Sequence, residues 1–432
     1  MSERASEPVG TAARARGGPG TSRFLFVAPP LAGHVNPMSG VAQALARRGH
    51  EVAWAASEML VRPLLGPDAT VYPTGSRVYR QQADRGLAAV KSLWERFILP
   101  FTRFTLPGVE KAVQAYAPDV LVVDQHAPAG ALVAHRHGLP WATMACSAME
   151  LTRPFASLPK VEAWVEGHLT RLWATAGLPP EERFDLRFSP YLLISFTGTA
   201  LTGDVAFPPH FALVGPALAD RPAPDFPWQW LDPGRRHVLV TTGTLADDLT
   251  TDFRHRAVEA VRPLADRVQA VLVAPDGTVP DPPGHVLVMP RVPMLSLLPH
   301  LDAVVSHGGQ NTVCEALAHG LPLVVAPIRH DQPVNAAQVA AAGAGIRVPF
   351  ARVSAERLRA AVTAVLEEPG YRAAAGRVRD SFATAGGAPA AAALLERLPA
   401  STRRTADRCP APTPGSRVTA GAHRPDLHPE HT

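Results

Sequence analysis

Residues 306–335 read SHGGQNTVCEALAHGLPLVVAPIRHDQPVN, and this stretch decides the fold. The apolar run 303–305 before it predicts a short buried strand, and a glycine-rich turn follows where that strand ends. Residues 311–319 have helical spacing, and 323–325 read as a second strand. The first amides of a helix have no internal partner and its dipole is positive there, so a strand, a glycine-rich turn and a helix N-terminus predict an anion site.

The polar side chains of this stretch suit a phosphate group and a sugar. His307 and Thr312 can donate to phosphate oxygens at the turn. Glu315, one turn into the helix, can accept from a diol such as the ribose hydroxyls. Asp331 and Gln332 offer an acceptor and a donor at the mouth of the same sheet. A diphosphate, a ribose and a sugar ring together describe a nucleotide-sugar.

The pattern resembles the donor-binding signature of the GT-B nucleotide-sugar glycosyltransferases, which include bacterial enzymes that glycosylate macrolides, polyketides and enediynes. The family motif has the form His-x-Gly-x-Asn-Ser/Thr-x-x-Glu, with Asp/Glu-Gln further along. The residues in register are His307, Gly309, Asn311, Thr312, Glu315, Asp331 and Gln332, and Gly308 lies within the motif. The alternative is an ordinary doubly wound α/β edge with a buried histidine and a solvated glutamate, and agreement at so many positions favours the glycosyltransferase.

The resemblance implies an α/β protein of the GT-B class, in which two Rossmann-like, doubly wound domains face each other across a cleft. The expected parts are an acceptor-binding domain at 23–215, a proline-rich linker at 216–235, a nucleotide-sugar donor-binding domain at 236–380 and a C-terminal helix at 381–399 that crosses back to the first domain. Residues 1–22 and 400–432 are polar and aperiodic, which predicts a disordered leader and a disordered tail.

The first domain opens with a βαβ pattern. Residues 24–28 predict a buried strand and residues 29–37 a loop, and Pro37 suits the first position of a helix. This arrangement puts His34 at the carboxyl end of the first strand, where ligands bind in such sheets. An imidazole there can take a proton from an acceptor hydroxyl. A lone histidine is more often structural, but a Gly-His pair in this loop is the general base of the family that the chain resembles.

Asp124 ends another buried run, residues 118–124, so it is expected at the same rim as His34. In the family that the chain resembles, an aspartate in this place is hydrogen-bonded to the catalytic histidine. The pair then follows the logic of a catalytic triad, with the acceptor oxygen as the nucleophile. Asp124 could instead cap the helix that follows. A serine hydrolase is excluded because the chain has no Gly-x-Ser-x-Gly motif.

Further donor-binding residues follow from the resemblance. The strand predicted at 237–244 ends in a turn that is similar to the family's phosphate-contacting turn, which makes Thr244 a candidate. Arg291, beside Val292, stands where plant enzymes have a tryptophan stacked on uracil, and Met294 stands where they have glutamine. A guanidinium also stacks on a base, so base binding is expected while the choice between TDP and UDP stays open.

The acceptor side is less specific. Aromatic and apolar side chains recur at helical spacing within 76–115, which is more often a core pattern than a ligand site. In a GT-B protein this region lines the acceptor cleft, so we expect an apolar acceptor, and residues 141–190 allow the same inference. The stripe in the first region consists of Tyr79, Trp94, Phe97, Ile98, Phe101 and Phe104. His126, His135 and His137 lack a further well-spaced metal ligand and are interpreted as surface or core histidines.

Composition limits the other possibilities. The chain has 432 residues, which is enough for two domains. The pI is about 9.2, but three of the four excess positive charges lie in the two predicted disordered ends, so no nucleic-acid partner is expected. The three cysteines lack metal spacing, and no apolar run is long enough for a membrane span or signal peptide. These features predict a cytoplasmic protein.

The sequence therefore predicts an inverting glycosyltransferase that moves a sugar from a TDP- or UDP-sugar to a hydroxyl of a small hydrophobic acceptor. No Asp-x-Asp motif is present, so neither a metal nor another cofactor is expected. A GT-B nucleotide-sugar epimerase is one alternative, although it would need carboxylate acid–base groups around the sugar. A non-catalytic sugar-nucleotide-binding homologue is another, and the presence of both His34 and Asp124 argues against it.

Overall fold

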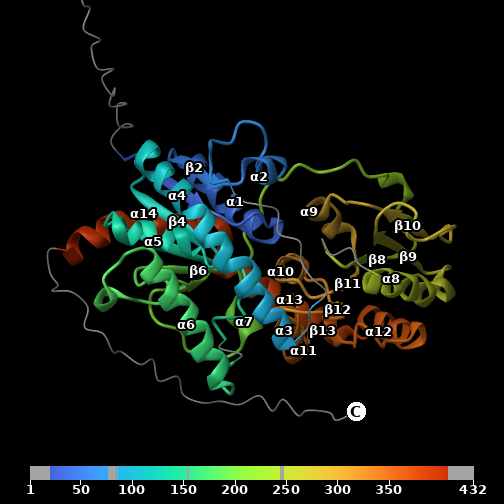
Figure 1. Ribbon diagram of the computed structural model, residues 1–432. Helices are drawn as coiled ribbons and strands as arrows, with labels where there is room; N and C mark the ends of the chain where they lie inside the picture. The colour runs from blue at the N-terminus through green and yellow to red at the C-terminus, as the bar shows by residue number, and fades with distance from the viewer. Residues whose placement is uncertain (1–19, 76–83, 85, 153–154, 244–247, 407–432) are drawn as a thin grey trace, which may run out of the picture.

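A computed structural model describes residues 20–75, 84, 86–152, 155–243 and 248–406. Within these residues the strands form two parallel sheets, one in each half of the molecule (Figure 1). The first sheet has the order β3-β2-β1-β4-β5-β6-β7, and the second has the order β10-β9-β8-β11-β12-β13. Residues 1–19 and 407–432, most of the predicted leader and tail, lie outside the described residues.

The elements of the first domain alternate between strands and helices. Its strands are β1 Arg23–Val27, β2 Glu51–Ala56, β3 Val71–Pro73, β4 Val120–Asp124, β5 Trp141–Ala145, β6 Leu193–Ser195 and β7 Phe211–Leu213. Its helices are α1 Ala32–Arg47, α2 Glu58–Leu65, α3 Gly86–Ser92, α4 Leu99–Tyr116, α5 Pro128–Arg136, α6 Pro159–Thr175 and α7 Thr199–Thr202.

The second domain repeats the alternation. Its strands are β8 Arg236–Thr241, β9 Val268–Val273, β10 Val286–Met289, β11 Ala303–Ser306, β12 Leu323–Val325 and β13 Gly345–Arg347. Its helices are α8 Asp248–Val261, α9 Met294–Leu297, α10 Gln310–Ala318, α11 Gln332–Ala341 and α12 Ala355–Glu367, followed by α13 Pro369–Ala385 and α14 Gly387–Ala406.

The central strands are apolar along their length because helices cover both faces of each sheet. In β1, Leu25 and Val27 belong to one core cluster while Phe24 and Phe26 belong to another. Successive side chains of a strand point to opposite faces, so the continuous apolar run fills two cores at once. This is why short runs of valine and leucine in the sequence marked the strands.

Each sheet reverses its strand order at one point. In the first sheet β1 lies between β2 and β4, and in the second β8 lies between β9 and β11. The connections leave such a pair of strands toward opposite faces of the sheet, which opens a crevice at their carboxyl ends. The ends of β1 and β4 therefore form one functional edge, and the ends of β8 and β11 form the other.

The prediction that the first helix begins at Pro37 is wrong. Helix α1 begins at Ala32, and Pro37 lies inside it, so His34 is in the first helical turn instead of a loop. Proline has no amide hydrogen, so the carbonyl of Gly33, four residues earlier, gains no bond from position 37. That carbonyl accepts a hydrogen bond from Asn311 Nδ2 in the second domain (2.8 Å). The proline thus frees an acceptor for a contact between the domains.

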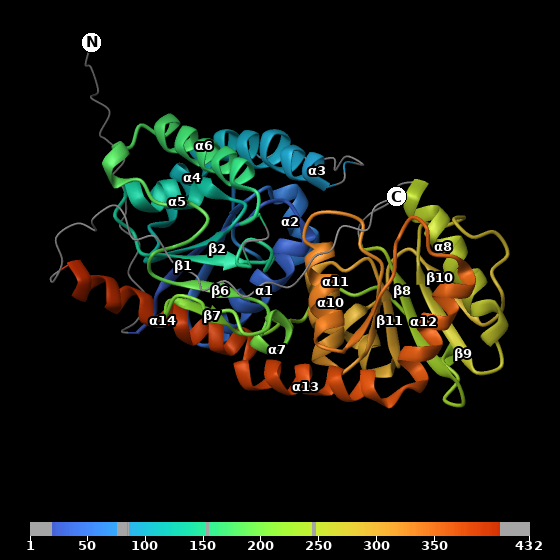
Figure 2. The same ribbon diagram turned by 90° about the horizontal axis from the view of Figure 1, so that it is seen from below.

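The C-terminal helices join the two domains. Figure 2 shows α13 beneath the second domain and α14 continuing beneath the first. Gly386 separates them and α14 begins at Gly387; these residues have φ angles of 84° and 56°, a left-handed conformation that favours glycine. Helix α14 then packs against α1, with Ala391 and Leu395 fully buried in the first domain's core. It continues to Ala406, past residue 400, where the sequence predicts the tail to begin.

No helix in the described part of the chain has both the length and the apolar composition to span a bilayer.

Candidate active site

A cleft of about 1320 Å³ lies between the two domains, and both domains line it. The first domain contributes the N-terminal turn of α1 and the segments that follow β4 and β5. The second contributes the segments that follow β8, β10 and β11 and the first turns of α10 and α11. A single small ligand typically occupies a pocket of about 300–1,000 Å³, so this cleft has room for two substrates.

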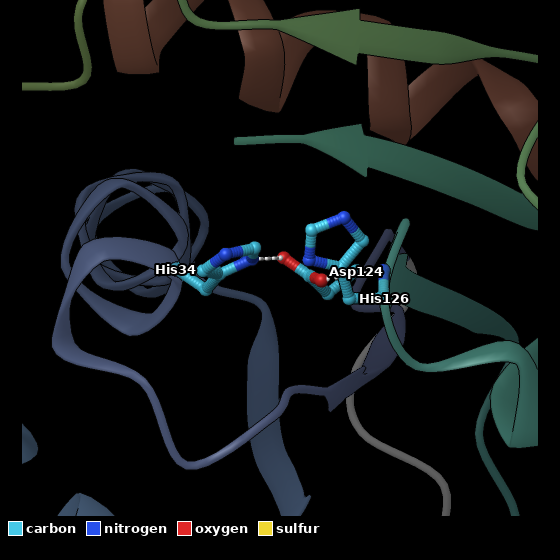
Figure 3. Close-up of side chains that lie close together, drawn as sticks. All are labelled: His34, Asp124 and His126. Carbon is cyan, nitrogen blue, oxygen red and sulfur yellow. Dashed lines mark hydrogen bonds and ion pairs between the residues drawn. The ribbon is translucent and has the colours of Figure 1, made fainter. Parts of the chain in front are cut away.

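His34 and Asp124 meet at the first-domain edge of the cleft. His34 Nδ1 lies 2.8 Å from Asp124 Oδ2, and the Asp124 side chain is fully buried (Figure 3). Burial alone would raise the pKa of Asp124, but His34 and the backbone amide of His126 lower it below its usual value. Asp124 does not cap α5, since Ala127 is the N-cap of that helix and no side chain caps it.

The hydrogen bond fixes the tautomer of neutral His34. An ionised carboxylate only accepts hydrogen bonds, so the ring proton lies on Nδ1 and donates to Asp124. Nε2 then carries the lone pair, and His34 lines the cleft. A basic nitrogen supported by a buried carboxylate is therefore present at the cleft wall.

The second-domain edge is built from the turn between β11 and α10. Gly308 has φ 88°, and a Cβ at this position would lie 2.8 Å from Val325 Cγ1, so only glycine fits. The His307 ring packs against the backbone at Gly243 and Gly309, where added Cβ atoms would lie 2.6 and 2.8 Å from it. The glycines thus let the turn close around the histidine.

His307 is held neutral. Burial, with help from the nearby Arg329, lowers the pKa of His307 to about 4. Its Nδ1 is buried and has no hydrogen-bond partner among the described residues. Since the ring lines the cleft beside the first amides of α10, a neutral His307 can donate to an anion there without carrying a charge.

Asn311, Thr312 and Glu315 occupy the first turns of α10 and line the cleft. Asn311 is engaged across the cleft with the Gly33 carbonyl. Glu315 is buried and forms an ion pair with Arg221, so it does not lie on a solvated helix face. Burial raises the pKa of Glu315, and Arg221 opposes that rise.

Asp331 and Gln332 begin α11 at the same mouth of the sheet. Gln332 Oε1 accepts from the amides of Ile328 and Arg329 at 2.9 Å each, which leaves its amide nitrogen as a donor. Asp331 Oδ2 accepts from Asn335 Nδ2 at 2.9 Å, and burial raises the pKa of Asp331. The two side chains offer an acceptor and a donor, the pairing that the sequence predicted.

The remaining predicted donor residues lie on loops. Arg291 and Val292 line the cleft after β10, together with Met294 at the start of α9, and Arg291 is exposed. β8 ends at Thr241, where the predicted turn begins. Thr244 lies outside the described residues.

Known proteins resemble this chain over most of its length. It is 32% identical to "4'-demethylrebeccamycin synthase" of Lentzea aerocolonigenes, over 87% of this chain and 99% of that protein. It is 31% identical to "Demethyllactenocin mycarosyltransferase" of Streptomyces fradiae, over 87% of this chain and 86% of that protein. Residues 265–398 match the family model "Erythromycin biosynthesis protein CIII-like, C-terminal domain".

The chain belongs to the natural-product glycosyltransferases. A solved structure of a glycotransferase of kitacinnamycin covers 88% of this glycosyltransferase at 26% identity and a TM-score of 0.73, with all of that chain matched. The predicted GT-B fold, with two parallel-sheet α/β domains, is confirmed.

The sequence missed His126 as a neighbour of the His–Asp pair in this glycosyltransferase. Its amide donates to Asp124 Oδ1 (2.8 Å), and its ring centroid lies 4.8 Å from that of His34 (Figure 3). Burial would lower the pKa of His126, but Glu150, with Oε1 3.6 Å from His126 Nε2, raises it. Its place just after the end of a buried strand was the available signal.

The described members of the aromatic stripe do not line the acceptor side of the glycosyltransferase, and the core pattern that the sequence favoured for them is confirmed for most. Trp94, Phe97, Ile98 and Phe101 are buried in the first domain's core. Phe104 is exposed and does not line the cleft, and Tyr79 lies outside the described residues. The apolar side chains that do line the first-domain wall are Leu31, Leu64, Leu93 and Met149. They are scattered in the sequence, so no helical period marks them.

Proposed function

We propose that this glycosyltransferase transfers a sugar from a TDP- or UDP-sugar to a hydroxyl of a small hydrophobic acceptor, with inversion at the anomeric carbon. The observation that carries the proposal is the position of the His34–Asp124 pair in the same cleft as the N-terminus of α10. One edge supplies a base and the other an anion site, which is what a direct displacement needs. The curated relatives, a 4'-demethylrebeccamycin synthase and a demethyllactenocin mycarosyltransferase by name, support a secondary metabolite as the acceptor.

In the proposed reaction, His34 Nε2 takes the proton of the acceptor hydroxyl as that oxygen attacks the anomeric carbon. A bond forms between the acceptor oxygen and the anomeric carbon. The bond from that carbon to the diphosphate oxygen breaks, and its electron pair leaves with the nucleotide diphosphate. Asp124 stabilises the imidazolium that His34 becomes, because the buried carboxylate lies 2.8 Å from Nδ1.

The departing diphosphate is stabilised, in this proposal, by the unpaired amides at the start of α10 and by His307 and Thr312. A hydroxyl of the nucleotide's ribose or deoxyribose donates to Glu315, the transferred sugar contacts Asp331 and Gln332, and Arg291 stacks on the base beside Val292. We propose that no metal takes part. His34, Asp124 and His126 are the one group among the described residues whose spacing suits a cation, and two of them already bond each other.

The rival functions fit less well. An epimerase acts on one substrate, whereas the cleft has room for two and carries apolar side chains on its first-domain wall. A non-catalytic homologue would have no need of a histidine held by a buried carboxylate. We further propose the cytoplasm as the compartment, because Cys146 and Cys314 are both free thiols.

The test is nucleotide release by the purified protein from UDP-glucose and TDP-glucose, with and without a panel of hydroxylated polyketide and aromatic acceptors. The proposal predicts release that depends on the acceptor and a glycoside whose anomeric configuration is opposite to that of the donor. Turnover of the donor without an acceptor would indicate a hydrolase or an epimerase, and retention of configuration would rule out the single displacement.

A further inference from the structure

Arg221 contacts the donor helix from outside the donor domain. It lies on residues 216–227, between β7 and the short helical turn at Trp228–Trp230. Its Nη2 donates to Glu315 Oε1 on α10. The Arg221 side chain is only 18% exposed and the Glu315 side chain only 7%. The ion pair is therefore largely removed from solvent. Removing one partner of such a pair has a much larger effect than removing one partner of a surface pair, because the other charge is left buried and uncompensated.

The first domain holds the backbone that carries Arg221. Gln43 Nε2 on α1 donates to the carbonyl of Asp220 at 2.8 Å. A Cβ on Gly40, one turn earlier in α1, would lie 3.0 Å from the carbonyl oxygen of Ala217 and 3.2 Å from the Cβ of Ala219. The segment thus lies directly against α1. The segment held by the first domain therefore places the Arg221 guanidinium against α10 of the second domain.

The contact leaves room for a ligand on Glu315. A carboxylate accepts hydrogen bonds on both oxygens, so the bond from Arg221 to Oε1 leaves Oε2 for a further donor. Arg221 also has a buried Nε without a hydrogen-bond partner among the described residues. Both Arg221 and Glu315 line the cleft. A sugar hydroxyl that enters here meets a carboxylate that Arg221 already holds on one side.

We propose that Arg221 is a positioning residue of the donor site: it holds the Glu315 carboxylate in one orientation, so that the free carboxylate oxygen accepts from a hydroxyl of the nucleotide's ribose or deoxyribose. This inference rests on the proposed function, because it assumes that a nucleotide ribose binds at Glu315. It adds that the first domain, through the segment on α1, takes part in donor recognition. Arg221 acts through Glu315, so its effect is confined to ligands that carry a ribose or deoxyribose.

The test is calorimetric binding of UDP, TDP and inorganic pyrophosphate to the full chain, without any acceptor. We expect Arg221→Met to weaken UDP and TDP binding about tenfold or more, because the charged hydrogen bond that orients the Glu315 carboxylate is lost. Pyrophosphate has no ribose, so its Kd is expected to stay within about twofold. Arg236→Met is the matched control, because Arg236 pairs with an aspartate, Asp302, outside the cleft.

Two further variants separate positioning from general stabilisation. Arg221→Lys keeps a cation and is expected to recover part of the lost nucleotide affinity. In a Glu315→Gln background, Arg221→Met is expected to add little, because the two residues act as one unit.

Some results would overturn the inference. Wild-type affinity for UDP and TDP in Arg221→Met would show that Arg221 does not position Glu315. An equal loss of pyrophosphate binding would show that the variant disrupts the cleft in general. If the wild-type protein binds pyrophosphate but neither nucleotide, the proposed donor site itself is wrong, and the inference is lost with it.

Discussion

In the first domain, the His34 imidazole and the Asp124 carboxylate bond each other, whereas in the second domain His307 keeps a buried Nδ1 without a partner among the described residues. Glu315, also in the second domain, pairs with Arg221, which reaches it from the connecting segment. Both edges are the carboxyl ends of parallel strands at a switch point. The His34–Asp124 pair is formed within one domain, whereas Glu315 is paired with a residue from outside its own domain.

The difference suggests a division of labour. The His34–Asp124 pair is assembled in one domain and needs no substrate to orient it. Substitutions of these two residues should therefore reduce turnover and leave nucleotide binding intact. Changes at the start of α10 should weaken nucleotide binding first.

The largest effect is expected for His34→Ala. Removing the base should lower the acceptor-dependent turnover by at least about a hundredfold, because general base catalysis typically contributes 10²–10⁴-fold. Nucleotide diphosphate release at saturating donor and acceptor measures it. His255→Ala is the control, since His255 is exposed on α8. A His34→Ala protein within threefold of the wild-type rate would exclude His34 as the base.

Asp124→Asn comes next. The amide can no longer accept as an anion, so neutral His34 loses the fixed tautomer and the imidazolium loses its counter-charge. We expect turnover to fall by roughly tens- to a hundredfold, while the nucleotide Kd stays unchanged. Initial rates and calorimetry on the same preparation check both values. A loss of nucleotide binding that matches the loss of rate would contradict the division of labour.

Gly308→Ala tests the other edge. The residue has φ 88°, and its Cβ would lie 2.8 Å from Val325 Cγ1, so the turn must shift. We expect the Kd for TDP to weaken about tenfold and the free energy of unfolding to fall by about 1–3 kcal/mol. Calorimetry and urea unfolding measure the two effects. Gly370→Ala, where no atom lies within 4 Å of the added Cβ, should change neither.

A smaller effect is expected where α14 docks on the first domain. Glu396 accepts two hydrogen bonds from Arg48 (2.6 and 2.7 Å) and lies 2.8 Å from His50 Nε2. Arg48 above all lowers the pKa of Glu396 to about 2. A depressed pKa means that the stabilisation is complete above about pH 4.5 and is lost as the pH falls toward 2. Glu396→Gln should cost less than about 1 kcal/mol at pH 7, because Arg48 and Glu396 are partly exposed to solvent, which screens the pair.

Thermal unfolding of Glu396→Gln against the wild type, at pH 7 and at pH 3, measures that contribution. The difference between the two proteins should shrink at the lower pH. A difference that grows on acidification would contradict the assignment.

No effect is expected from a chelator. If the α10 N-terminus and its neighbours stabilise the diphosphate, then excess EDTA should leave the transfer rate within experimental error of the untreated enzyme. Added Mg²⁺ should not raise it. A rate that falls sharply with EDTA and returns with a divalent cation would show that a metal ion stabilises the departing diphosphate.

The sequence predicted the elements whose pattern is local. The apolar runs of β1, β4 and β11 fill cores on both sheet faces, so they stand out without knowledge of the fold. Because parallel strands end at one edge, His34 and Asp124 could be placed near each other although they are 90 positions apart. The glycine-rich turn before α10 was equally easy to recognise, because its backbone conformation and close packing leave no room for a side chain at Gly308.

What the sequence did not predict depends on contacts between distant segments. Arg221 lies in a proline-rich stretch with no periodicity, and nothing in that stretch points to Glu315. The start of α1 was misplaced because proline is favoured at a first helical position, whereas Pro37 is tolerated inside the helix. The aromatic stripe was ambiguous because a helical period shows which face of a helix is buried, but does not show whether a core or a ligand covers that face.

The most direct test of the central claim is a calorimetric titration of TDP into His34→Ala alongside the wild-type protein. If the base is assembled apart from the donor site, the two proteins should bind TDP with Kd values within about twofold of each other, although only the wild type transfers sugar. A Kd more than tenfold weaker in His34→Ala would contradict the account, because His34 would then belong to the donor site.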